Sequence, residues 1–163
     1  MKANKNLRVG IGFDIHRFKK GRKLFLGGVN IPYELGLDGH SDADVLLHAL
    51  CDALLGAMAK PDIGRNFPDT DPKYKNISSK LLLNKVMNMV DRGKFNLINV
   101  DCIVIADEPK INIFSDRIQN KISKITGLSK KSVGIKAKTT EGILSFSGKG
   151  IAVYCVALLE KDK

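Results

Sequence analysis

The segment from Ser41 to Met58 constrains the fold more than any other, because it is apolar on nearly every side. Ser41 is a good helix N-cap, and Asp44 follows three residues later, as in a capping box. A helix that is hydrophobic all round must be buried by other elements. The sequence therefore predicts a central, mostly buried helix that ends before Pro61.

One polar stripe interrupts this helix, and its sequence context favours a bound cation. At about 100° per residue, the stripe consists of Ser41, Asp44, His48 and Asp52. A stripe of this kind is most often a solvated face. However, the chain has 27 lysines and arginines, and none lies between Lys23 and Lys60, where five acidic residues and two of the three histidines, His40 and His48, are found. This acidic island in a basic protein indicates a cation site.

Two further side chains predict a metal centre together with His48. Asp14 and His16 end a strand-like run that starts at Leu7, and their i, i+2 spacing places them on one face of a strand. Two imidazoles and one carboxylate leave a fourth tetrahedral position open, which is typical of catalytic zinc. Each of these residues alone is common in proteins without metals, but as a set they predict a metal site.

A polar loop near the C-terminus has the composition of a phosphate-binding loop. Residues 136–141 and 147–150 supply hydroxyls, lysines and glycine-flanked backbone amides, which can hold phosphate oxygens. Glu141 could hold a harder cation such as Mg²⁺ on a diphosphate. Loops of this composition are usually only loops, so this interpretation depends on the metal centre.

The rest of the chain alternates strand-like runs with single helical stripes. We expect a hairpin over residues 23–33, helices over 78–93 and 109–127, and strands over 95–106, 133–138 and 151–159. Pro109 should open the third helix, and Gly10 and Gly12 should be a strand feature rather than a dinucleotide loop. The pattern predicts an α/β fold of the α+β type, with a single mixed β-sheet, helices on one face and a small β-hairpin. Residues 1–163 should form one domain with a ferredoxin-like arrangement.

Composition limits the class of protein further. The cysteines, Cys51, Cys102 and Cys155, lie far apart in apolar segments, as is typical of buried thiols in a reducing compartment. Residues 1–8 contain no apolar signal core, and no run of about 20 apolar residues follows. We therefore expect a soluble, cytoplasmic protein with no membrane partner.

The net charge of +10 raises the alternative of a nucleic-acid-binding module. Against it, the lysines are spread along the chain, and 6% aromatic residues without tryptophan leave few surfaces on which bases could stack. That alternative also leaves the histidines and the acidic island unexplained. We therefore expect no nucleic acid among the partners.

Seven ordered motifs closely resemble the 2-C-methyl-D-erythritol 2,4-cyclodiphosphate synthase family, over about residues 7–160. They are Gly12–His16, Gly27–Tyr33, His40–Ala49, Asp52–Ala57, Asp62–Gly64, Phe67–Pro72 and Lys138–Glu141. The resemblance implies a lyase of the non-mevalonate isoprenoid pathway, acting on 4-diphosphocytidyl-2-C-methyl-D-erythritol 2-phosphate. In this reaction the substrate's 2-phosphate attacks the β-phosphorus of its own diphosphate, closes the cyclodiphosphate and expels CMP.

The resemblance also implies cofactors and assembly. One Zn²⁺ per chain would be bound by Asp14, His16 and His48. Mg²⁺ or Mn²⁺ would accompany the substrate diphosphate at Glu141. The family is a homotrimer with its active sites at the subunit interfaces, so residues 106–112 would form a cytidine pocket across a subunit boundary.

The same resemblance implies residue roles. His40 and Thr139 would stabilise the transition state. The substrate would be bound by Ser41, Asp62, Ile63, Gly64, Phe67, Pro68, Asp69, Thr70, Asp71, Ala106, Pro109, Lys110, Ile111, Thr140, Phe146 and Lys149.

The chain departs from the family pattern at three places. Lys138 stands where a third threonine is usual, Lys149 stands where an arginine is usual, and the segment 141–146 is one residue longer. Lysine keeps the charge of arginine but loses its two-pronged hydrogen bonding, so these changes bear on how the nucleotide phosphates are bound. The main rival within enzymes is a metal-dependent phosphohydrolase acting on a nucleoside diphosphate derivative, in which the same ligands would activate water.

Overall fold

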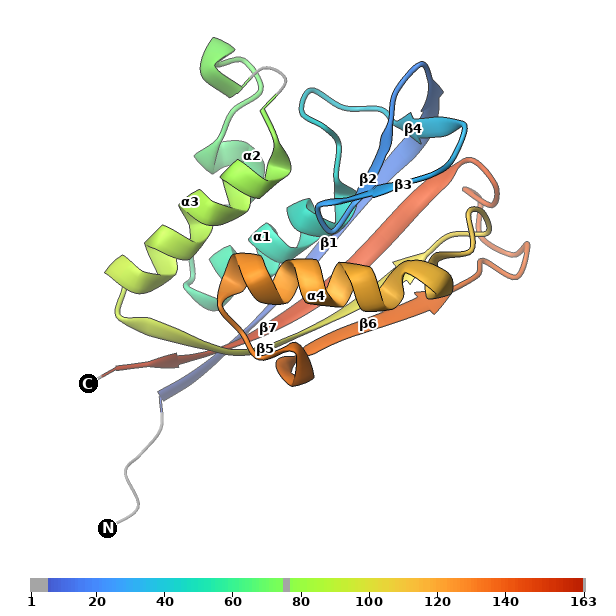
Figure 1. The fold of residues 1–163 in the computed structure, drawn as a ribbon. Coiled ribbons are helices and arrows are strands. Elements are labelled where there is room, and N and C mark those ends of the chain that lie inside the picture. The colour runs from blue at the N-terminus through green and yellow to red at the C-terminus, as the bar shows by residue number, and fades with distance from the viewer. Residues whose placement is uncertain (1–5, 75–76, 163) are drawn as a thin grey trace.

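The computed structural model describes residues 6–74 and 77–162, and its main feature is a five-stranded sheet with the order β4-β1-β7-β5-β6 (Figure 1). The strands are β1 (Asn6–Lys20), β4 (Leu35–Leu37), β5 (Phe95–Ile105), β6 (Val133–Lys138) and β7 (Gly150–Lys161). A separate hairpin is formed by β2 (Leu24–Leu26) and β3 (Val29–Ile31). It turns at Gly27 and Gly28, as the sequence predicts.

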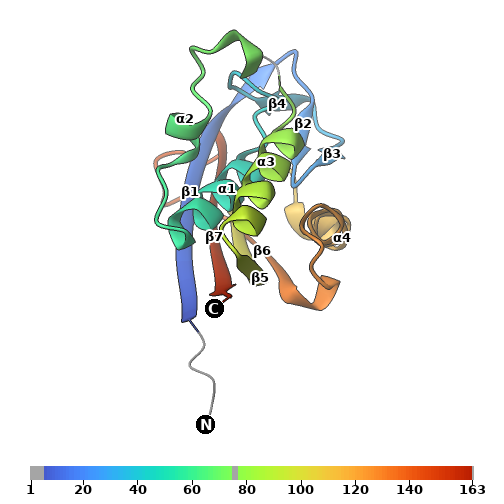
Figure 2. The same cartoon turned by 90° about the vertical axis from the view of Figure 1, so that its left-hand side faces the viewer.

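Helices cover one face of this sheet, which confirms the predicted mixed sheet with helices on one side. α1 (Val45–Ala57) packs on β1 and β7, α3 (Ser79–Arg92) contacts α1 and β5, and α4 (Ser115–Thr126) packs on β6. Figure 2 shows α1 and α3 in front of the strands, with α4 beside them on the right, seen along its axis. Shorter helical turns lie in the connections: α2 (Ile63–Asn66), η1 (Pro72–Tyr74), η2 (Ile111–Phe114) and η3 (Lys130–Ser132).

The expected ferredoxin-like arrangement is wrong. A ferredoxin-like fold has the chain order β-α-β-β-α-β, whereas here β5 and β6 are parallel neighbours joined through α4. β7 then pairs antiparallel with both β1 and β5 and lies between them. The physical reason is that β7 is a long, mostly buried strand, and the place between β1 and β5 buries it and pairs both of its edges, which leaves β6 at the sheet edge.

α1 is buried on nearly every side, as predicted, and Leu46, Leu50 and Leu54 have no exposed surface. Its start differs from the prediction. The N-cap is Asp44, whose carboxylate accepts a hydrogen bond from the Leu47 amide. Ser41 is therefore not the cap but lies in the loop before it. The carboxylate of Asp44 lies one turn closer to the apolar run than the Ser41 hydroxyl, so it is the better-placed acceptor for the first amides of the helix.

The third helix also begins later than predicted. Pro109 does not open it, because it lies before the separate turn η2 and outside α4. η2 follows, and α4 runs from Ser115 to a left-handed C-cap at Gly127. The predicted apolar stripe is nevertheless correct. Its buried members are Ile111, Phe114, Ile118 and Ile122.

The buried thiols that composition predicts are found in the structure. All three cysteines are buried and free. None of the described helices combines the length and the hydropathy that crossing a bilayer requires. The expectation about residues 1–8 falls partly on residues 1–5, which lie outside the described residues.

Two glycines let α1 approach β1 closely. A Cβ atom on Gly12 would lie 1.9 Å from the carbonyl oxygen of Ala49, and one on Gly10 would lie 2.0 Å from that of Ala53. No side chain fits at these distances, so only glycine allows the helix backbone to lie on the strand backbone. The interpretation of this pair as a strand feature is confirmed.

We predict that Gly12→Ala lowers the free energy of unfolding by about 3 kcal/mol or more, because α1 would have to move away from β1. Gly56→Ala is the matched control, since its Cβ would meet nothing closer than 3.7 Å. Alanine is the better helix former, so this change should raise the unfolding free energy by up to about 1 kcal/mol. Urea denaturation of both variants gives the two values, and equal effects would contradict the close approach.

Candidate metal centre and active site

The ligand atoms of Asp14, His16 and His48 converge on one point, as the sequence predicts. Asp14 and His16 lie on the helix-facing side of β1, and His48 lies in the first turn of α1. Oδ2 of Asp14 is 2.9 Å from Nε2 of His16 and 3.0 Å from Nδ1 of His48, and the two nitrogens are 3.4 Å apart. Metal bonds of 2.0–2.1 Å in a tetrahedron separate ligand atoms by roughly 3.3 Å. The three groups therefore fit a zinc-sized cation.

Hydrogen bonds on the far sides of both imidazole rings orient their lone pairs toward this point. Nδ1 of His16 faces the carbonyl oxygen of Asp38 and can only donate to it. Nε2 of His48 lies 2.9 Å from the Ser79 hydroxyl and 3.2 Å from that of Ser41. In a neutral ring whose outer nitrogen carries the hydrogen, the inner nitrogen is left as an acceptor. This is the arrangement that supports metal-bound histidines.

The charge of the site also suits a cation. Burial raises the pKa of Asp14, but the contacts with His16 and His48 outweigh it and hold that pKa well below its ordinary value. Burial lowers the pKa of His16, and the neighbouring Asp14 carboxylate raises it to a net value above the ordinary one. The carboxylate is therefore ionised at neutral pH, and a proton competes for His16 as the pH falls.

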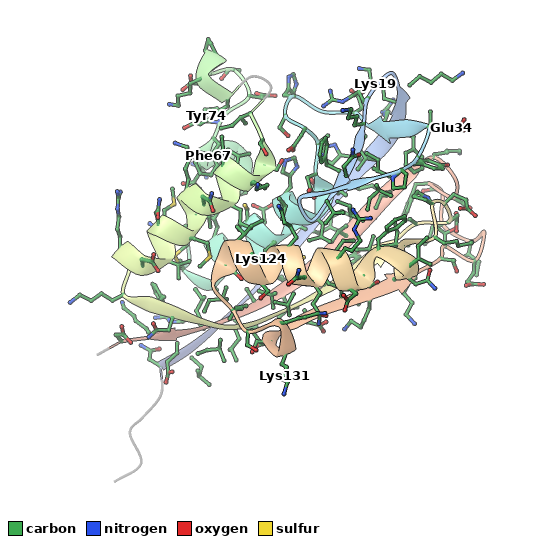
Figure 3. The ribbon with its side chains drawn as sticks, viewed as in Figure 1. Lys19, Glu34, Phe67, Tyr74, Lys124 and Lys131 are labelled. Carbon is green, nitrogen blue, oxygen red and sulfur yellow. The ribbon has the colours of Figure 1, made fainter. Side chains whose placement is uncertain are left out.

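A cavity of about 360 Å³ adjoins the metal centre and contains several predicted substrate residues. It is lined by His16, Gly39, His40, Ser41, His48, Ile63, Gly64, Phe67, Asp69, Tyr74, Ile77 and Leu82. Phe67 packs edge-on against Tyr74, with ring centroids 5.5 Å apart (Figure 3). Asp62 supports the cavity from outside as the N-cap of α2, where it accepts from the Arg65 amide. Three other predicted residues, Pro68, Thr70 and Asp71, are not part of its lining.

Arg22 holds the loop that presents His40, and sequence reasoning missed it. Its guanidinium donates to the carbonyl oxygens of Gly39 (2.7 Å) and Ser41, on either side of His40. The His40 side chain itself is 75% exposed and lies 3.4 Å from a carboxylate oxygen of Asp69. The Arg22 contacts join residues 17 and 19 positions apart, so no local pattern could have indicated them.

The acidic island lies beside the possible metal group, as the sequence predicts, and supplies its His48, but none of its carboxylates belongs to that group. Its carboxylates instead accept hydrogen bonds from backbone and side-chain donors where helices and turns lack other acceptors. Asp44 binds the amides of Gly27, Gly28 and Leu47. Asp42 binds Ser78 and Ser79 at the start of α3, Asp52 binds the Ile63 amide, and Asp38 binds Lys19. In the described part of the chain, the metal group therefore combines His48 from this stretch with Asp14 and His16 from β1.

A second cavity, of about 200 Å³, lies at the carboxyl ends of β5 and β6. It is lined by Ala106, Lys110, Ile111, Asn112, Ala137, Lys138 and Thr139. This brings together the predicted cytidine segment and Thr139, although Pro109 is not in the lining. Ile15, Ala152, Ile105 and Lys138 form one row across the sheet. Within one chain, three strand spacings, about 14 Å, therefore separate this cavity from the metal centre.

The loop after β6 contains the remaining predicted residues. The Thr139 hydroxyl donates to Glu141. Phe146 and Lys149 line a third cavity, of about 490 Å³, next to His16. Thr140, which was also predicted to contact substrate, is buried, and both its amide and its hydroxyl bind Asp107. Asp107 is the second residue that sequence reasoning missed.

Comparisons with known proteins agree with this geometry. The YgbB family matches residues 7–160. The chain is 51% identical over 154 residues to a 2-C-methyl-D-erythritol 2,4-cyclodiphosphate synthase from Caldicellulosiruptor bescii, with 93% of this chain and 98% of the relative covered.

Two solved structures share the fold. The bifunctional IspDF from Campylobacter jejuni has a TM-score of 0.92 and 41% identity over 98% of this chain, which spans 44% of that longer protein. A 2C-methyl-D-erythritol-2,4-cyclodiphosphate synthase in a CDP-bound form has a TM-score of 0.87 and 35% identity, with 93% of this chain and 99% of the other covered. The chain therefore belongs to the YgbB family, together with the cyclodiphosphate synthases that it resembles over nearly its whole length.

Proposed function

We propose that this chain converts 4-diphosphocytidyl-2-C-methyl-D-erythritol 2-phosphate into 2-C-methyl-D-erythritol 2,4-cyclodiphosphate and CMP. A 2-phosphate oxygen forms a bond to the β-phosphorus, and the bond from that phosphorus to the bridging oxygen breaks, so that CMP leaves with the electron pair. The observation that carries the proposal is the convergence of Asp14, His16 and His48 beside a cavity lined by His40, in a relative of cyclodiphosphate synthases. We also propose that residues 1–163 act as one catalytic domain.

Zinc is the cation that best suits the three ligands, at one ion per chain. When bound, it would supply positive charge that orients a phosphate oxygen. We propose Glu141 as the residue that holds Mg²⁺ or Mn²⁺ with the substrate diphosphate, because its exposed carboxylate is an oxygen ligand of the kind that hard cations prefer.

Internal phosphoryl transfer asks the protein mainly for positioning and charge neutralisation, because the nucleophile is tethered to the substrate. His40 and Thr139 would contact the transferring phosphate, and Lys149 with Phe146 would lie along the nucleotide phosphates. The cavity beside the metal suits the methylerythritol part, with apolar Ile63 and Phe67 next to polar groups. Its proposed contacts are Ser41, Asp62, Gly64, Pro68, Asp69, Thr70 and Asp71. The second cavity would hold cytidine, through Ala106, Pro109, Lys110 and Ile111.

A homotrimer would complete each site from two chains. One chain keeps the metal centre and Thr139 about three strand spacings apart, too far for one phosphate to touch both. The helix-free face of the sheet also exposes apolar side chains, which monomers rarely leave in one patch. They include Val9 (68% exposed), Ile11 (69%), Phe13, Ile15, Tyr154 and Val156. Both observations support active sites at subunit interfaces.

We predict that His48→Ala empties the metal site, from roughly one zinc per chain to well below half, because only two ligands remain. His40→Ala is the control and should keep its zinc, since His40 lies outside the ligand group. Elemental analysis measures the metal, and circular dichroism checks that α1 remains folded. Full zinc in the His48 variant would refute the ligand assignment.

We predict that the reaction incorporates no oxygen from water. In ¹⁸O-enriched water, phosphorus NMR of the product should show two coupled diphosphate signals without ¹⁸O. A phosphohydrolase would instead place solvent oxygen in a linear phosphate. That outcome would refute the cyclase reaction and support the metal-dependent phosphohydrolase instead.

We predict that His48→Ala and Thr139→Ala chains complement each other when co-expressed. The His48→Ala variant alone should be nearly inactive. The Thr139→Ala variant alone should turn over about 10- to 1,000-fold more slowly than wild type, because it loses one transition-state contact. Random assembly should restore about a quarter of the wild-type activity, because one interface in four joins two intact halves. The assembly should have a mass of three 17.9 kDa chains. A fully active monomer, or no restored activity, would contradict shared sites.

A further inference from the structure

The Asp107 carboxylate gathers four donors from the loop between β6 and β7. Oδ1 accepts from the amide of Thr140 (2.9 Å) and from its hydroxyl (2.9 Å). Oδ2 accepts from the hydroxyl of Ser147 (2.8 Å) and from the amide of Gly148 (2.9 Å). These bonds span 33 to 41 residues of sequence. One side chain therefore fastens both the start and the end of the loop.

We define this loop as residues 139–149. Besides Asp107, it is held by a hydrogen bond between the Thr140 and Ser147 hydroxyls (2.9 Å) and by backbone hydrogen bonds within its turns. Residues 141–145 are all exposed, and Ile143 is 84% exposed. Glu141, Gly142 and Gly148 have positive φ angles, so the backbone makes sharp turns without a packed core to impose them. The hydrogen bonds to Asp107 are the contacts best placed to keep these turns in one shape.

Asp107 also joins the loop to the cytidine cavity. Its backbone oxygen accepts from Nζ of Lys110 (3.0 Å), and Lys110 lines that cavity. The hydrogen bonds from Thr140, Ser147 and Gly148 lower the pKa of Asp107 to about 2. The carboxylate is therefore ionised at neutral pH and accepts at both oxygens.

We propose that Asp107 is a positioning residue, whose carboxylate acts as an internal anion that shapes the 139–149 loop for a nucleotide diphosphate and aligns it with the cytidine cavity. This inference rests on the proposed function, because the loop contains Thr139, Glu141 and Lys149. It assigns Asp107 no contact with the reacting atoms. Its effect reaches the substrate through the donors that the loop presents.

Asp107→Asn tests the inference with almost no change in shape. The amide keeps one oxygen for Thr140 but turns an NH₂ group toward the Gly148 amide, which cannot accept from it. The end of the loop near Lys149 should therefore loosen first. Asp116→Asn is the matched control. Asp116 is an exposed carboxylate on α4 that pairs with Lys130, and it lies away from the loop. It removes the same charge without touching a backbone amide of the loop.

The experiment measures binding of CDP and of cytidine by calorimetry, together with hydrogen exchange of the Gly148 amide, in the full zinc-loaded protein. Asp107→Asn should weaken CDP binding about tenfold and speed Gly148 exchange. Cytidine binding and zinc content should stay within about twofold of wild type, and Asp116→Asn should change nothing. A purely structural role would weaken CDP and cytidine alike. Unchanged CDP binding, or equal losses for both ligands, would overturn the inference.

Ser147→Ala is a milder variant that keeps the test decisive if Asp107→Asn folds poorly. It removes one donor to the carboxylate, and CDP binding should weaken about threefold with cytidine binding unchanged. Wild-type protein that binds CDP but forms no cyclic product would refute the proposed function, and the comparison of CDP with cytidine would still decide the role of Asp107. Wild-type protein that binds no CDP would overturn both.

Discussion

The backbone contact between α1 and β1 is the interaction on which the rest of the structure depends. Gly10 and Gly12 remove the side chains that would hold the helix away, so Ala49 and Ala53 lie directly on the strand. The same face of β1 continues to Asp14 and His16, and the helix residue just before Ala49 is His48. The register that the glycines allow is thus the register that brings three ligands to one point. The packing of α1 on β1 and the grouping of the three possible metal ligands thus have a common geometric origin.

Most carboxylates around this centre accept hydrogen bonds from backbone amides. The Asp44 carboxylate is fully buried, where it joins the β2–β3 turn to the start of α1. Asp42 accepts from the Ser79 amide at the start of α3. These bonds satisfy amides that a helix or tight turn cannot pair by itself. Among the acidic residues nearest the histidines, Asp14 is the one whose oxygen faces their inner nitrogens. The site is therefore surrounded by hydrogen-bonded carboxylates, while a single carboxylate, that of Asp14, belongs to the ligand group.

The parts of this structure that the sequence could predict are those with a local period. The i, i+2 spacing of Asp14 and His16 and the polar stripe through His48 predicted the group of possible metal ligands. Apolar periods located the long helices and strands but not the short elements β4 and α2. Contacts between distant residues have no such pattern. Arg22 and Asp107 are ordinary charged residues in sequence, and only the fold brings them to the carbonyls and amides that they bind. Pro109 was predicted to open a helix, but η2 comes first and α4 begins only at Ser115. The place of β7 between β1 and β5 depends on pairing between strands that are far apart in sequence.

β1 has a further consequence for how this protein can change over evolutionary time. Its even-numbered positions from Gly10 to His16 face α1, while the odd-numbered positions from Val9 to Ile15 face away from the helices. Neighbouring residues are thus subject to different constraints. The even-numbered positions must fit against α1, and the odd-numbered positions must suit the outer surface of the sheet. A single-residue insertion would exchange the two sets at once. The strand should therefore tolerate substitutions at alternating positions far better than any change in its length.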